Sequence, residues 1–87
     1  MALLSVLHRV RDYSSWKAVY DALDELQRDW GVTVGSVHQL VEDPNTVLVP
    51  RSFATVAQAQ GFLTSREVEL AMRRAGVEGV PRVEIYA

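Results

Sequence analysis

The order in which two hydrophobic periods follow one another along the chain most constrains what it can fold into. Strand-like apolar segments and helix-like spacings of three and four residues occur in the order strand, helix, strand, strand, helix, strand. This order is a split βαβ unit built twice, and it predicts an antiparallel sheet with helices on one face only. A chain of 87 residues has the length for a single domain of this kind, spanning residues 1–87.

The first expected strand, Ala2–Val10, indicates that the other face of the sheet is covered too. Within Ala2–Leu7, apolar residues occur at both odd and even positions, so they lie on both faces of the strand. A strand with one solvent-exposed face alternates apolar and polar side chains. A chain this short buries only roughly 60 to 65% of its unfolded surface, so association is a plausible source of stability. We therefore expect a homodimer.

The first helical segment has clear start and stop signals. Asp12 offers a side-chain acceptor at its start, and Gly31 ends it. One side is apolar, at Trp16, Val19, Tyr20, Leu23, Leu26 and Trp30. The opposite side is expected to carry Lys17, Asp21, Asp24, Gln27 and Arg28.

Two strands, Thr33–Val41 and Val47–Phe53, are expected to form an antiparallel hairpin. The segment Asp43–Thr46 between them has turn chemistry, with Asp first, Pro second and Asn third. The register of this hairpin is ambiguous by one residue. Because a shift of one residue exchanges the two faces of a strand, the face occupied by His38 stays open.

The second helical region contains two start signals. Thr55 and Thr64 each begin a capping box, which favours a kinked or broken helix with its break near Gly61–Ser65. Gly76 is expected to end the region in a left-handed conformation. The last strand is expected at roughly Arg82–Tyr86.

Two interleaved βαβ halves give a four-stranded antiparallel sheet in the order last, first, third, second, which is the ferredoxin-like arrangement. The strand Val47–Phe53 is then central. Pro50 lacks the N–H group that a central strand needs, so it predicts a bulge or distortion beside Val49 and Arg51.

The segments His8–Trp16, Glu42–Val47 and Ala75–Pro81 resemble those of the dimeric α+β barrel superfamily. That superfamily includes antibiotic-biosynthesis monooxygenase-like proteins, small polyketide-cyclase-like enzymes and haem-degrading monooxygenases. The resemblance implies two ferredoxin-like subunits that pack their sheets face to face, each with a cavity between its own sheet and helices. The chain departs from the usual pattern at Pro50 and Arg51.

His8 and Arg51 are the candidate catalytic residues. His8 is in phase with Leu4 and Val6 on the expected helix-facing side, and Arg51 shares that side if Val49 faces the helices. Imidazole moves protons near neutral pH while guanidinium stays charged, so the pair could polarise a carbonyl or phenolate and transfer a proton. The structural alternative is that His8 caps a carbonyl and Arg51 pairs with an acidic residue at the end of the sheet.

Aromatic side chains provide candidate walls for a substrate pocket. We assign substrate binding to Trp16, Tyr20 and Phe53, with His38 as a further candidate if the hairpin register turns it toward Arg51. At helical spacing, Trp16 and Tyr20 are first of all expected to pack against the sheet.

Composition and motifs argue against several functions. A net charge of −2 and a pI near 5.6 provide no basic surface for nucleic acid or an anionic membrane. The chain has no Cys and only two His, so we expect no metal site, and it lacks a glycine-rich phosphate loop, so we expect no dinucleotide cofactor. Met1–Leu7 is short for a signal peptide, which makes a cytoplasmic location the default expectation.

These observations favour a small-molecule enzyme of secondary metabolism. It would carry out cofactor-independent cyclisation, isomerisation or monooxygenation of a hydrophobic, oxygenated, polyketide-like substrate in the cavity between sheet and helices. His8 would transfer the proton, and Arg51 would stabilise the developing oxyanion. The alternative is a non-catalytic dimeric ligand-binding or accessory protein whose cavity is small or filled by side chains.

Overall fold

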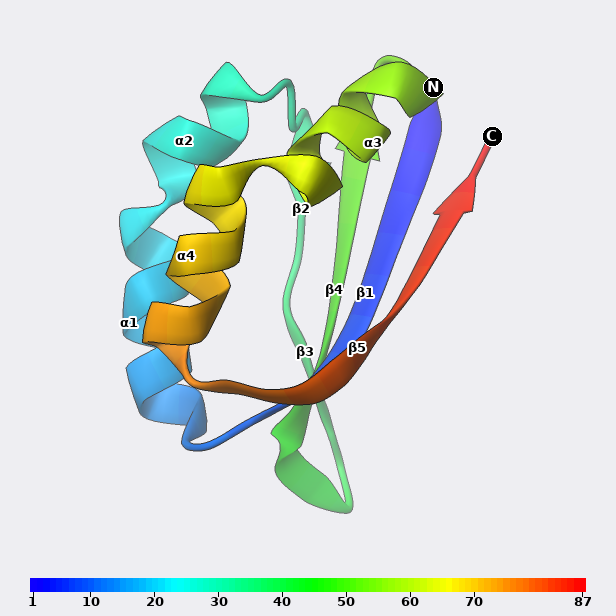
Figure 1. The fold of residues 1–87 in the computed structure, drawn as a ribbon. Helices are drawn as coiled ribbons and strands as arrows, with labels where there is room; N and C mark the ends of the chain where they lie inside the picture. The colour runs from blue at the N-terminus through cyan, green and yellow to red at the C-terminus, as the bar shows by residue number, and fades with distance from the viewer.

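Four helices lie on one face of an antiparallel sheet in the computed structural model, which describes residues 1–87 (Figure 1). The opposite face of the sheet carries no helix. In chain order the elements are β1 (Ala2–Val10), α1 (Tyr13–Ala22), α2 (Asp24–Asp29), β2 (Val34–Gly35), β3 (His38–Leu40), β4 (Asp43–Phe53), α3 (Val56–Thr64), α4 (Arg66–Ala75) and β5 (Val77–Tyr86).

The strands are ordered β2-β4-β1-β5, and β3 also pairs with β4 beyond β2. This confirms the predicted ferredoxin-like order, with β4 and β1 at the centre. The expected second strand, Thr33–Val41, is split into β2 and β3. The last strand begins at Val77 and not near Arg82, and a register shift opposite Leu7 and Arg9 accommodates the extra residues around Gly79.

Strand β1 alternates strictly between the two faces of the sheet. Its even-numbered residues are buried against the helices, including Leu4, Val6 and His8. Leu3 and Leu7 point to the face without helices. Both faces of this strand are therefore apolar, as the sequence indicated.

The strand that pairs with β4 on its outer side is interrupted at Pro50, whereas β4 itself continues through this residue. The β1–β4 ladder runs without a register shift from Ala2 opposite Phe53 to Arg9 opposite Thr46, so it contains no bulge beside Pro50. The predicted distortion lies instead in the outer strand, whose pairing with β4 stops at Gly35 opposite Arg51 and resumes at His38 opposite Leu48. The Pro50 carbonyl accepts from the Ser36 N–H at 3.2 Å, which shows that its backbone faces the outer strand. Pro50 has no N–H to give there, and the outer strand is interrupted at this point.

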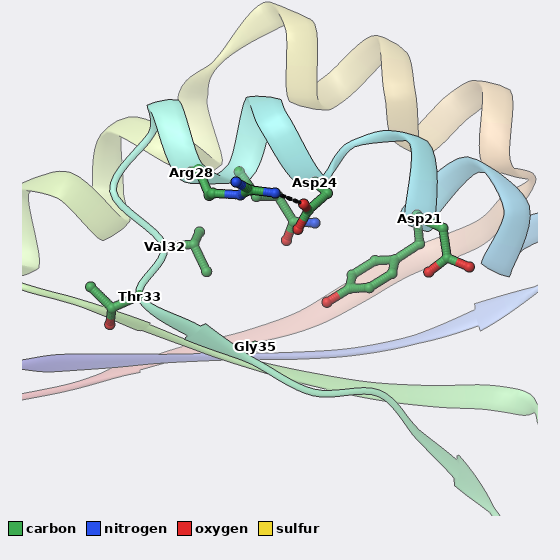
Figure 2. A pocket seen from close by; sticks show the side chains of 8 residues that line it. Asp21, Asp24, Arg28, Val32, Thr33 and Gly35 are labelled. Carbon is green, nitrogen blue, oxygen red and sulfur yellow. Dashed lines mark hydrogen bonds and ion pairs between the residues drawn. The ribbon is translucent and has the colours of Figure 1, made fainter.

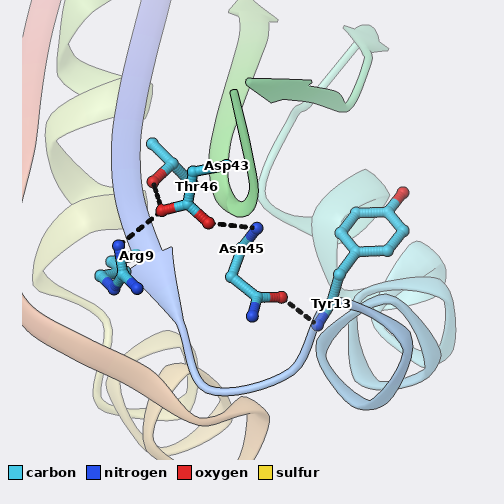
Figure 3. A network of polar contacts seen from close by, with 5 residues as sticks. All are labelled: Arg9, Tyr13, Asp43, Asn45 and Thr46. Atoms are coloured by element: carbon cyan, nitrogen blue, oxygen red, sulfur yellow. Dashed lines mark hydrogen bonds and ion pairs between the residues drawn. The ribbon is translucent and has the colours of Figure 1, made fainter. Parts of the chain in front are cut away.

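The expected turn at Asp43–Thr46 is wrong, because these residues begin β4, where a polar network ties them to β1 and to the start of α1 (Figure 3). The Asp43 carboxylate accepts from the Asn45 N–H, the Thr46 hydroxyl and the Arg9 guanidinium. The Asn45 side chain in turn accepts from the Tyr13 N–H at 2.9 Å. Asp43–Thr46 forms an irregular part of β4, since Leu40 pairs with Asp43 and the tight turn falls at residues 41–42.

Both helical regions are broken. The first is capped by Asp12, which accepts from the Ser15 N–H, and it breaks at Leu23 between α1 and α2. The second is capped by Thr55 as predicted, but its second cap is Ser65 and not Thr64, because the Ser65 hydroxyl accepts from the Val68 N–H. Gly76, with φ of 82°, ends α4 in the predicted left-handed conformation.

The core lies between the sheet and the helices in two clusters. One centres on Leu4, Val6, Phe53, Ala59, Phe62 and Val68. The other centres on Val10, Trp16, Val47, Val49 and Ala75. His8 and Arg51 lie on the same buried face of the sheet as these side chains, which places two ionisable groups inside an otherwise apolar layer.

Candidate functional site

His8 and Arg51 line one small cavity between the sheet and the helices. Its volume is about 30 Å³, close to the space of a single water molecule. Nine of its twelve lining residues are hydrophobic, and these come from the four helices and Leu23, whereas β1 and β4 contribute only His8 and Arg51. The cavity is lined by His8, Trp16, Tyr20, Leu23, Leu26, Gln27, Arg51, Phe62, Val68, Ala71, Met72 and Ala75.

His8 is buried without a hydrogen-bond partner. Only 6% of its surface is exposed, and neither Nδ1 nor Nε2 has a protein partner. Burial, together with the nearby charge of Arg51, lowers the pKa of His8 to about 4. The imidazole is therefore neutral at pH 7 and has a ring nitrogen free to accept a proton.

Arg51 is a buried cation with no carboxylate partner. It is 5% exposed, and its Nε donates to the Gln27 side-chain oxygen at 2.7 Å, while Nη1 has no partner. Burial lowers the pKa of Arg51 to about 10, so the guanidinium keeps its charge at neutral pH. Its charged centre lies 5.6 Å from the Tyr20 ring and 4.9 Å from the Phe62 ring, which offer a weak substitute for an anion.

The aromatic walls Trp16 and Tyr20 are stacked on each other, and the Trp16 ring lies tilted against the imidazole of His8. The Trp16 ring lies 5.5 Å from the His8 ring and 5.1 Å from the Tyr20 ring, centre to centre. This arrangement confines His8 to the floor of the cavity on β1 and places a flat apolar surface beside it. An anionic oxygen that enters this cavity would meet the charge of Arg51 beside an apolar surface.

The structure brings four of the six predicted site residues together and separates two. His8, Arg51, Trp16 and Tyr20 line the cavity. His38 pairs with Leu48, on the face of the sheet without helices, where it is exposed and bonded to the Ser36 hydroxyl. Phe53 is buried and packs against Phe62 at 5.6 Å, but it does not line the cavity.

Gln27 belongs to the site although the sequence pattern assigned it to the polar side of the helix. It is 7% exposed and holds Arg51. A single helical projection continued through Leu23 already puts Gln27 on the same side as Trp16 and Tyr20. A signal was present, since Gln27 is four residues after Leu23 and three before Trp30, which is apolar-face spacing.

A larger cleft opens on the outer side of the same helices. It has a volume of about 400 Å³ and lies between the α1–α2 region and the strand β2 (Figure 2). Its lining is mostly polar and comprises Tyr20, Asp21, Asp24, Gln27, Arg28, Val32, Thr33 and Gly35. Tyr20 and Gln27 therefore line both the cleft and the cavity.

No group of three or more His, Asp or Glu side chains is arranged to hold a metal ion. None of the helices has the length and apolar character required to cross a membrane.

Solved structures with the same fold span almost the whole chain. A candidate antibiotic biosynthesis monooxygenase from Bordetella bronchiseptica matches with a TM-score of 0.83 and 14% identity, covering 99% of this chain and 95% of that one. One from Nitrosomonas europaea has a TM-score of 0.77 and 15% identity, covering 100% and 97%. SnoaB, a cofactor-independent oxygenase from Streptomyces nogalater, has a TM-score of 0.80 and 7% identity, covering 99% and 90%.

The sequence itself matches no family model and no curated protein. At identities of 7 to 15%, the structural likeness establishes the fold. The chain therefore shares the fold of the antibiotic biosynthesis monooxygenase-like proteins, which confirms the resemblance seen in its turns and helix starts.

The buried His8 predicts an acid-sensitive fold. The pKa of His8 is about 4 in the folded protein and 6.5 in an unfolded chain. Between pH 4 and pH 6.5, the unfolded chain therefore binds a proton that the folded chain does not. Stability is therefore lost as the pH falls from 6.5 toward 4, by roughly 3 kcal/mol from this residue. Urea unfolding at several pH values should show a smaller loss in His8→Leu than in the wild type. In the matched control His38→Gln, which removes an exposed imidazole, the loss should persist, and an equal loss in His8→Leu would contradict the assignment.

Proposed function

We propose that this protein is an enzyme that converts a hydrophobic, oxygenated small molecule at the His8–Arg51 cavity without a bound cofactor. The observation that carries this proposal is the pair of buried polar side chains with unpartnered nitrogen atoms facing one apolar cavity. Each buried unsatisfied polar group costs about 1 to 3 kcal/mol, so such a pair favours a polar partner in the cavity, either a bound water or a polar group of a ligand that displaces it. The names of the structural neighbours, among them a cofactor-independent oxygenase, support the same class of activity.

His8 acts as the proton acceptor and Arg51 as the stabiliser of the resulting anion. The low pKa of His8 makes it a weak base by itself. A phenol or enol that binds beside Arg51 becomes more acidic, because the guanidinium stabilises its anion in a dry site. That anion in turn stabilises the protonated imidazole, so the two groups act together.

The substrate anion can then follow either of two routes. In oxygenation, a CH2 group next to the anionic ring gives its electrons to dioxygen and becomes a carbonyl. The second oxygen atom leaves as water, so no other reductant is needed. In cyclisation or isomerisation, His8 returns the proton to a different atom of the substrate.

Removing either group should abolish turnover. His8→Leu and Arg51→Met keep much of the side-chain volume, and each should lower kcat at least 100-fold, since positioned acid–base groups contribute about 10²- to 10⁴-fold. We would measure oxygen consumption and product masses with a panel of hydroxylated anthrones and naphthols. His38→Leu, on the other face of the sheet, is the matched control and should keep the wild-type rate.

Wild-type rates in folded His8→Leu and Arg51→Met would end this mechanism. If the panel binds in an Arg51-dependent manner but none of its members is converted, the non-catalytic ligand-binding alternative gains support. The small volume of the cavity is the observation that favours this alternative.

Gln27→Glu tests whether the free charge of Arg51 matters. A carboxylate at this position would lie against Nε, now 2.7 Å from the Gln27 oxygen, and would neutralise the guanidinium. We expect the free energy of unfolding to rise by about 2 kcal/mol as the buried cation gains a partner, while kcat falls at least tenfold. Chemical denaturation and the turnover assay measure the two effects. Gln60→Glu adds the same charge at an exposed site and should change neither, and unchanged turnover in Gln27→Glu would remove Arg51 from the mechanism.

We also propose that two copies of the chain pair through the sheet face that has no helices. Leu7 and Leu48 lie opposite each other on this face and are each 37% exposed, with Leu3 and Pro50 beside them. These apolar side chains, with Ser5 and Ser52 between them, are best covered by another apolar surface, and a second copy offers an identical one.

Leu7→Lys should convert a dimer to a monomer. Light scattering should give about twice the chain mass of 9.7 kDa for the wild type and the single-chain mass for the variant. Leu70→Lys alters a similarly exposed leucine on α4 and should remain dimeric. A wild type that is monomeric at assay concentration would contradict the proposal.

A further inference from the structure

The cavity and the cleft are neighbouring spaces that share two lining side chains. Tyr20 and Gln27 line the small cavity on one side and the large cleft on the other. We call these two residues the wall. Tyr20 lies on α1 and Gln27 on α2, so the wall is built from two helices that meet at the break at Leu23.

The sizes of the two hollows show where the body of a ligand has to lie. The cavity, at about 30 Å³, holds one water molecule. The cleft, at about 400 Å³, falls in the range of about 300 to 1,000 Å³ that is typical of ligand pockets. A molecule with several rings that reaches His8 and Arg51 therefore needs the volume of the cleft for most of its atoms.

The wall is positioned by contacts that a ligand could replace. The Gln27 oxygen accepts from Arg51 Nε, and the oxygen of an anionic ligand could take over this bond. The Tyr20 hydroxyl lies so close to the backbone of Gly35 that a Cβ there would come within 3.3 Å of it. Glycine at position 35 thus lets the tyrosine ring close against β2, while the far side of the ring stacks on Trp16 at 5.1 Å.

The lining of the cleft indicates what the outer part of the ligand carries. Asp24 and Arg28 pair with each other along α2 on one side of the cleft (Figure 2). Asp21 pairs with Lys17 on α1. These exposed carboxylates have further lone pairs that can accept from hydroxyl groups of a ligand. On the opposite side Thr33 has a hydroxyl that donates to the Ser52 carbonyl and can still accept a hydrogen bond. The carboxylates at the rim of the cleft favour hydrogen-bond donors on the outer part of a ligand. The cation of Arg51 at the inner end favours an anionic oxygen.

We propose that the cleft is the binding site for the body of an elongated, multiply hydroxylated aromatic molecule. Its inner phenolic or enolic oxygen passes the Tyr20–Gln27 wall to meet Arg51. This proposal rests on the proposed function for the identity of the reacting end. It adds the larger binding site, its entrance and the hydroxylated outer end of the ligand.

The experiment uses 1,2,5,8-tetrahydroxyanthraquinone as a probe, because it is coloured, has three fused rings and carries hydroxyl groups at both ends. Titration of the full-length wild-type protein should give saturable binding. Thr33→Trp fills the cleft without altering a cavity residue and should weaken binding at least tenfold. Thr64→Trp is the matched control, since Thr64 is also exposed and also bonds a backbone carbonyl, but lies outside the cleft.

Amide chemical shifts of the wild-type protein provide a measurement that needs no variant. Saturation with the probe should shift the signals of Asp21, Asp24, Arg28 and Thr33, which lie along the cleft. Shifts confined to the α3 and α4 side of the cavity, around Phe62 and Met72, would overturn the proposal.

The outcome also separates this proposal from the proposed function. If Arg51→Met weakens probe binding while Thr33→Trp does not, the cleft is not the binding site, yet Arg51 still holds the anion. If neither substitution weakens binding, or the probe does not bind, the proposal for the cleft fails. The turnover assay of the His8 and Arg51 variants then decides the catalytic mechanism by itself.

Discussion

The arrangement of the site depends on one interaction, the hydrogen bond between the buried guanidinium of Arg51 and the neutral side chain of Gln27. A carboxylate at position 27 would satisfy the charge, whereas an amide orients the guanidinium and leaves it uncompensated. The uncompensated charge of Arg51 also affects His8, Tyr20 and Phe62. The charge helps to keep His8 neutral, and it draws the rings of Tyr20 and Phe62 around it.

The same strand that carries Arg51 also shapes the approach to it. Pro50 gives no N–H to the outer strand, which is interrupted between β2 and β3. Only a two-residue strand remains opposite Ser52 and Arg51, and the small Gly35 lies there beside the tyrosine of the wall. Pro50, which interrupts the outer strand, thus lies next to Arg51, which places a charge on the buried face of the sheet. This fits the general observation that departures from regular pattern gather at functional sites.

Sequence reasoning located the polar pair because the argument needed only the two-residue period of strands. His8 follows Leu4 and Val6 on one face, and Arg51 follows Val49 on the facing strand, so both point toward the helices. The face of His38 could not be read in this way, since it depends on the hairpin register. That register is set by an irregular turn in which Leu40 pairs with Asp43.

The sequence by itself determined the order of strands and helices, the apolar character of both faces of the first strand, most of the helix caps and the shared face of His8 and Arg51. These properties follow from local periodicity and capping, which act over a few residues. Only the tertiary structure decided that Gln27 holds Arg51 and that Phe53 lies outside the cavity. It also decided that a cleft lies behind the Tyr20–Gln27 wall. Such contacts depend on the angle at which broken helices pack against the sheet, which no short-range pattern specifies.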